Sequence, residues 1–164
     1  MRLGYFRKTR KTGRILAALL LAAVLCGFAP ISGVHARAIP DEWDEVFNTA
    51  RAVLAKMPDA TRLEAAIKDT SLREAVLRAY RSLKACAKVN KDQTRAVKQG
   101  TLAEFERAFK SVQTEAERGD YQSCAAKCKT DGATCEQDCA SARKKLCSCK
   151  LIEFGCFVTQ CLSA

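Results

Sequence analysis

Apolar residues between Pro40 and Gly119 recur at three- and four-residue steps, which places them on one face of an α-helix. The first series ends at Pro58, because proline interrupts a helix. Its members are Trp43, Val46, Phe47, Ala50, Val53, Leu54 and Met57. Later series predict helices over residues 61–68, 71–90, 92–99 and 101–119. No segment before residue 120 alternates like a strand, so we expect a bundle of three or four helices that cover one another's apolar faces.

Four of the expected helix starts carry a capping box. In this motif a Ser or Thr is followed three positions later by Glu or Gln, and both side chains bind free backbone N–H groups. The boxes begin at Thr61, Ser71, Thr101 and Thr134. Gly100 is expected to close the helix before the third box, since glycine is common just past a helix end. We interpret Glu64, Glu74 and Glu104 as capping residues rather than as catalytic acids.

Residues 120–164 hold eight of the ten cysteines. The eight are Cys124, Cys128, Cys135, Cys139, Cys147, Cys149, Cys156 and Cys161. Cysteines four positions apart project from one face of a helix, and the stretch from Lys129 to Gly132 resembles a turn. The spacing therefore predicts two short antiparallel helices, the first of them capped by Asp120. Such a hairpin favours the bridges Cys128–Cys135 and Cys124–Cys139.

The remaining four tail cysteines follow this predicted hairpin. Cys147 and Cys149 would bond separately with Cys156 and Cys161, in an order left open because eight cysteines allow 105 connectivities. An apolar run lies among them, made of Leu151, Ile152, Phe154, Phe157 and Val158. This run either packs beneath the bridges or forms an exposed binding patch, and packing is favoured.

The amino-terminal residues 1–38 are typical of an export signal. Basic residues precede an apolar stretch that starts at Ile15, and small-residue cleavage patterns end at Ala36 and Ala38. An uncleaved membrane anchor is the alternative, because the stretch to Val34 approaches the length that spans a bilayer. After cleavage we expect no stable membrane span and a periplasmic or extracellular location.

Export makes disulfides the expected state of the tail, since thiols outside the cytosol are normally oxidised. Cys26 would leave with the signal, so nine cysteines remain and at least one is unpaired or bonded to another chain. Cys86 is the candidate for a buried free thiol; otherwise it joins the tail to the bundle or links two chains in a disulfide-bonded dimer. The alternative for the tail is a thiolate site for Cu or Zn built from the same eight cysteines.

Charge and histidine content exclude several functions. The net charge of +10 includes seven basic and no acidic residues in the signal, which leaves 21 basic against 18 acidic groups. Nucleic-acid binding is therefore not expected, because it needs a clustered basic face. The run Arg143, Lys144, Lys145 is interpreted as a solvated helix face. The one histidine, His35, lies in the signal, so Ser-His and Cys-His catalysis are not expected.

These observations predict an all-α protein with a helical bundle at 39–119 and a cysteine-rich, disulfide-stapled helical hairpin at 120–164. We expect neither an enzyme nor a cofactor. The predicted function is that of an exported protein-binding or structural protein with an unknown protein partner. The alternative is sequestration of a thiophilic metal ion in the cell envelope.

Overall fold

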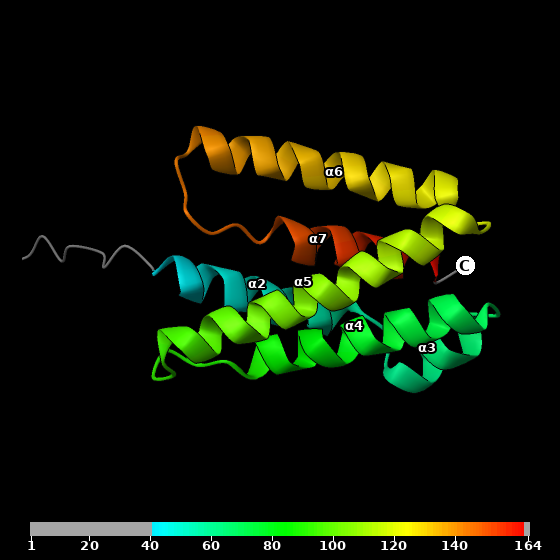
Figure 1. Ribbon diagram of the computed structural model, residues 1–164, viewed down its shortest axis with the longest axis horizontal. Coiled ribbons are helices and arrows are strands. Elements are labelled where there is room, and N and C mark those ends of the chain that lie inside the picture. Colours follow the sequence, from blue (N-terminus) through cyan, green and yellow to red (C-terminus); the bar gives the residue numbers. More distant parts are fainter. Residues whose placement is uncertain (1–40, 163–164) are drawn as a thin grey trace, which may run out of the picture. The chain divides into compact units, whose positions relative to one another are not determined.

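The computed structural model describes residues 41–162, which are almost entirely helical (Figure 1). The elements are α2 (Glu42–Lys56), α3 (Ala60–Ala66), α4 (Thr70–Lys88), α5 (Arg95–Arg118), α6 (Gln122–Ser141), α7 (Cys149–Cys156) and the π-helical segment η1 (Phe157–Cys161). No strand occurs within residues 41–162, so the predicted all-α class is confirmed. The expected export signal and its cleavage sites lie outside the described residues.

The first four of these helices begin at side chains that accept a backbone hydrogen bond, as short polar residues do at helix starts. Asp41, Asp59, Asp69 and Thr94 cap α2, α3, α4 and α5, respectively. In α3 and α4 the capping aspartate stands two residues before the predicted capping box. The predicted capping roles of Thr61 and Ser71 are therefore wrong. Glu64 and Glu74 are consequently exposed helix residues rather than caps.

One continuous helix, α5, replaces the two helices predicted around Gly100. The Thr101 hydroxyl donates to the carbonyl of Val97, with 2.9 Å between the oxygens, and so does not cap a new helix. A glycine inside a helix costs only about 1 kcal/mol, which the long buried face of α5 outweighs. That face comprises Leu102, Phe105, Ala108, Phe109, Val112 and Ala116. Glu104 is therefore an exposed interior residue of α5 and not a cap.

The core of the bundle lies between α2, α4 and α5. The short connection at residues 89–94 makes α4 and α5 an antiparallel pair, and α2 packs against α4 (Figure 1). Side chains with at most 2% of their surface exposed fill this space, among them Phe47, Val76, Leu83, Phe105 and Val112. The predicted apolar stripes thus face one another, as burial of apolar surface requires.

The tail returns to this core through α7. Phe154 is fully buried, and its ring meets those of Phe105 and Phe109 edge-on at centroid distances of 5.7 and 5.4 Å. Gly155 allows α7 to approach α2 closely, because a Cβ atom there would lie 2.8 Å from Cγ1 of Val53. The described parts of the bundle and of the tail therefore share one core and belong to one compact unit.

Candidate functional site

All eight tail cysteines form disulfides that join α6 to residues 147–161, which run back along it and are called the returning segment (Figure 1). The pairs are Cys124–Cys161, Cys128–Cys156, Cys135–Cys149 and Cys139–Cys147, with Cα–Cα distances of 5.8, 5.7, 5.5 and 6.2 Å. Each bridge encloses the next one along the sequence, so the four are fully nested. We call these four bridges, together with the two segments that they join, the disulfide ladder.

The predicted bridges Cys128–Cys135 and Cys124–Cys139 are wrong, because residues 122–141 form one helix rather than a hairpin. At about 1.5 Å per residue, Cys124 and Cys139 lie about 22 Å apart along the helix axis, far beyond the roughly 7 Å limit between the Cα atoms of a disulfide. The four α6 cysteines instead share one face, since their offsets of 4, 11 and 15 residues correspond to rotations of about 40°, 20° and 60°. Each of them bonds to a cysteine of the opposite segment, so the expected bonds of Cys147 and Cys149 to Cys156 and Cys161 are also wrong.

Gly132 and Thr134 lie inside α6, although the sequence suggested a turn and a cap there. The Thr134 hydroxyl donates to the carbonyl of Thr130, with 3.1 Å between the oxygens. Gly132 is buried against Glu153, and a Cβ atom at this position would lie 2.9 Å from Oε2 of Glu153 and 3.3 Å from its Cβ. The glycine thus permits close packing of α6 on α7. The predicted Asp120 cap is also wrong, because α6 begins after Tyr121 with no side-chain cap.

The helix α6 has little apolar surface of its own to bury. Its buried residues are Cys128, Gly132 and Cys139. Helices in proteins are normally held by the packing of an amphipathic face, and α6 lacks a wide one. The disulfide ladder therefore supplies the attachment that burial supplies for the other helices. By contrast, the apolar run from Leu151 to Val158 packs into the core, as the sequence favoured. Its exposed member is Ile152, with 40% of its surface accessible.

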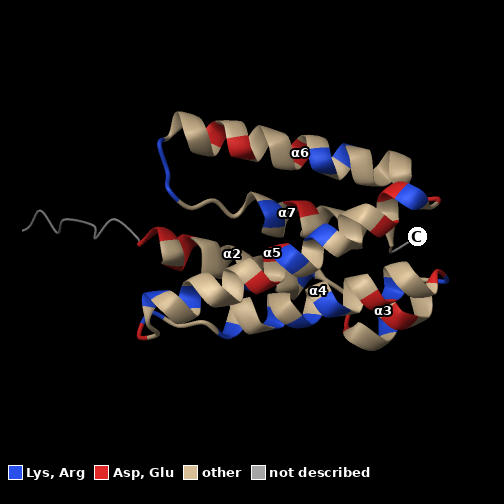
Figure 2. Ribbon diagram, in the orientation of Figure 1, with Lys and Arg blue, Asp and Glu red and all other residues tan. Residues whose placement is uncertain are grey.

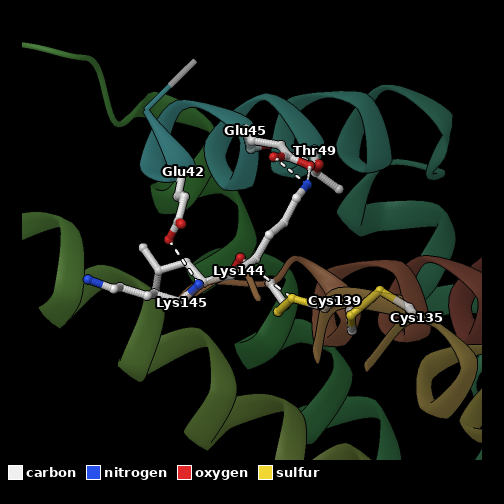
Figure 3. Close-up of polar contacts among 10 residues, drawn as sticks. Glu42, Glu45, Thr49, Cys135, Cys139, Lys144 and Lys145 are labelled. Atoms are coloured by element: carbon white, nitrogen blue, oxygen red, sulfur yellow. Dashed lines mark hydrogen bonds and ion pairs between the residues drawn. A yellow bond between two sulfur atoms is a disulfide. The ribbon is translucent and has the colours of Figure 1, made fainter. Parts of the chain in front are cut away.

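The loop between α6 and α7 is fastened to the start of α2 (Figure 3). The Lys144 ammonium lies 2.6 and 2.8 Å from the two carboxylate oxygens of Glu45, and the backbone N–H of Lys145 donates to Glu42 at 3.1 Å. Arg143 adopts a left-handed backbone with φ of 53°. The basic run predicted as a helix face thus lies in a loop, and it interacts with the acidic first turn of α2.

A cleft of about 360 Å³ opens between α5, α6 and the returning segment. Its apolar lining includes Phe109, Val112, Ala116, Ala125, Cys128 and Phe157. Polar residues also line it, namely Gln113, Glu117, Gln122, Lys129 and Glu153. Because α6 forms one wall, the disulfide ladder fixes the width of this cleft.

A chain of polar contacts at the cleft connects three helices. Gln113 of α5 donates to Oε1 of Glu153 at 2.6 Å, and Oε2 of Glu153 accepts from Lys150 at 3.2 Å. Lys150 also lies 3.1 Å from Glu136 of α6. Burial alone would lower the pKa of Lys150, but its hydrogen bonds to Glu136 and Glu153 raise that pKa above its ordinary value. Glu153, only 3% exposed, is thus held at the centre of this network.

Neither Glu153 nor Gln113 was predicted from the sequence as a functional residue. The available signal was the single acidic residue within the apolar run from Leu151 to Val158. A buried carboxylate is retained only where it is paired or hydrogen-bonded, so an acid at that place predicts polar partners on neighbouring helices. Sequence alone does not identify those partners, because Gln113 lies forty residues away.

Cys86 is the one unpaired cysteine among residues 41–162. It is fully buried on α4, and its Sγ lies 3.7 Å from the carbonyl oxygen of Thr101. Burial raises the pKa of the Cys86 thiol to about 12, so the thiol is protonated at neutral pH. It interacts with the core of the bundle and is separate from the disulfide ladder.

The described residues hold no group of three or more His, Cys, Asp or Glu arranged around a metal ion. Sulfur atoms in disulfides do not bind metal as thiolates, so the metal alternative requires the reduced tail.

Among the helices within residues 41–162, none is both long and apolar enough to span a bilayer. Figure 2 shows both signs of charge on α3, α5 and α6.

In comparisons with known proteins, no family model matches this chain, and neither a curated protein nor a solved structure shows detectable similarity to it.

Proposed function

We propose that this is an exported, non-enzymatic protein that binds another protein in the periplasm or outside the cell. The observation that carries the proposal is the disulfide ladder. Four disulfides are compatible with an oxidising compartment, and the apolar, basic amino terminus supports export. The binding element we propose is the module formed by α6 and α7.

The small contribution of α6 to the core supports a binding role for this helix. This 20-residue helix buries few side chains in the core, yet eight cysteines are used to fix it against the returning segment. Its outward positions, such as Ala133 and Gln137, are exposed. A helix held rigidly in place without serving the core presents a preorganised surface, and preorganisation lowers the entropic cost of binding.

A photo-crosslinking experiment tests the proposal in the producing cell. A benzophenone amino acid replaces Ala133 on the outward face of α6 or, as a matched control, the equally small and exposed Ala85 on α4. We expect a discrete protein adduct from position 133 that is absent from position 85. Equal adducts from both positions, or none from position 133, would contradict binding through this module.

The mass of the exported protein tests compartment and oxidation independently. We expect the signal to be removed and the denatured chain to be eight hydrogens lighter than its reduced form, as four disulfides require. One cysteine should react with an alkylating agent after denaturation, namely Cys86. A chain that retains bound metal and exposes eight further thiols when the metal is removed would support the sequestration alternative instead.

A further inference from the structure

The cleft between α5, α6 and the returning segment has the properties of a small-molecule site, which goes beyond protein binding. Its volume of about 360 Å³ lies within the range of ligand pockets, roughly 300 to 1,000 Å³. Such pockets combine an apolar lining with a few placed polar groups. Here the aromatic rings of Phe109 and Phe157 contribute to the apolar part, and Glu153 is the buried polar group.

The walls of the cleft are fixed before any ligand binds. The bridge Cys128–Cys156 joins α6 to α7 at the cleft, and Cys128 is itself part of the lining. Phe109 is held on the opposite side by its edge-on contact with Phe154. A site that does not need to close around its ligand avoids the ordering cost of binding.

Two side chains of the lining, Glu153 and Gln113, offer hydrogen-bond acceptor positions in the cleft. A carboxylate has about four acceptor positions, and Glu153 receives one bond from Gln113 and one from Lys150. The amide nitrogen of Gln113 makes the contact to Glu153, and no hydrogen bond to its amide oxygen occurs among the described residues. The one cation of the lining, Lys129, is paired with Glu117 at 3.1 Å.

The charges at the cleft are also unbalanced toward the negative. Three carboxylates, those of Glu117, Glu136 and Glu153, are linked to two ammonium groups, those of Lys129 and Lys150. The set therefore carries one negative charge in excess. A ligand that complements both features has a hydrogen-bond-donating cationic head.

We propose that this cleft binds small amphipathic amines, with the ammonium group donating to Glu153 and Gln113 and the apolar body between Phe109 and Phe157. The apolar body of the ligand displaces water from the apolar lining, and this removal of apolar surface from water favours binding. The ammonium group replaces its hydration by charge-assisted hydrogen bonds to a preplaced carboxylate. A ligand with a carboxylate head would be placed against the carboxylate of Glu153 and is expected to bind more weakly.

The test compares two probes with the same ring system, tryptamine and indole-3-propionate, on the oxidised exported protein. Titration followed by ¹H–¹⁵N NMR should show tryptamine binding at least tenfold more tightly than the acid, with shifts concentrated around Gln113 and Glu153. Equal affinities for the two probes, shifts located elsewhere, or no binding of tryptamine would overturn the proposal.

Three variants locate the interaction. Glu153→Gln keeps the shape of the side chain and removes its charge, and we expect tryptamine affinity to fall about tenfold. Ala125→Leu fills the cleft from α6 without touching Glu153 and should weaken tryptamine binding at least as much. Glu106→Gln removes an exposed carboxylate of α5 that does not line this cleft and should leave binding unchanged.

The variants also separate binding from folding. Each should keep the far-ultraviolet circular dichroism spectrum and the four-disulfide mass of the parent protein. If Glu153→Gln alters the fold, Ala125→Leu still decides the outcome, since unchanged tryptamine affinity in that variant would overturn the location of the site.

Discussion

The contact between Gly155 of α7 and Val53 of α2 predicts a measurable coupling between the tail and the bundle. In Gly155→Ala the new Cβ atom would lie 2.8 Å from Cγ1 of Val53 and 3.5 Å from its Cγ2. Valine in a helix has one strongly preferred rotamer, so Val53 does not move away freely. The disulfides of Cys149 and Cys156 hold α7 on both sides of the contact, so α7 does not withdraw either.

Two effects of opposite sign decide the size of the change. Overpacking in a filled core costs about 1 to 3 kcal/mol, whereas alanine in place of glycine within a helix gains about 0.8 to 1.0 kcal/mol. Gly155→Ala should therefore leave the free energy of unfolding unchanged or lower it by up to about 2 kcal/mol. In a Val53→Ala background the clash is absent, and the same substitution should stabilise by about 1 kcal/mol.

The assay is a double-mutant cycle by guanidinium chloride unfolding with the disulfides intact. The effect of Gly155→Ala should differ by about 1 to 3 kcal/mol between the two backgrounds. Because the helix-propensity gain is common to both, the difference reports the clash alone. Effects that agree within about 0.5 kcal/mol, the range expected for independent sites, would refute the close packing of α7 on α2.

The remaining predictions concern single groups. Burial raises the pKa of Cys86 from 9.0 to about 12, so the unfolded state ionises first and stability should fall between pH 9 and 12, by about 1.4 kcal/mol per pH unit. Cys86→Ala should flatten that part of the unfolding free-energy profile. Lys144→Ala should cost less than about 1 kcal/mol, because the pair with Glu45 is exposed, and a larger loss in denaturant unfolding would contradict this. Replacing both Cys139 and Cys147 by alanine should cost roughly 2 to 3 kcal/mol, and a neutral result would show that this innermost bridge constrains little.

Helical periodicity was sufficient to predict the class and most of the core, because burial of an apolar face is a local pattern. Helix boundaries were less predictable. The motifs at Thr101 and Thr134 and the glycines at positions 100 and 132 are compatible with both a helix end and a helix interior. What decides between them is contact with distant segments, such as that of Gly132 with Glu153.

The disulfide pattern was predictable only in part. The offsets of 4, 11 and 15 residues from Cys124 already fit one face of a continuous helix, and this signal outweighs a turn at Gly132. The partners of those cysteines depend on where the returning segment lies. Burial of Phe154 against Phe105 and Phe109 helps to position the returning segment. Because these contacts join residues far apart in the chain, the local sequence around the cysteines does not predict them.

The nested order of the bridges makes one peptide segment dispensable for the integrity of the molecule. The exposed residues Arg143, Lys144 and Lys145 lie between the innermost cysteines, Cys139 and Cys147. A trypsin-like protease that cuts there separates the chain into two polypeptides, and all four disulfides cross the cut. The product migrates as one molecule without reductant and as two with it. Cleavage in this loop would thus convert the protein into a covalent two-chain form that keeps α7 in its place.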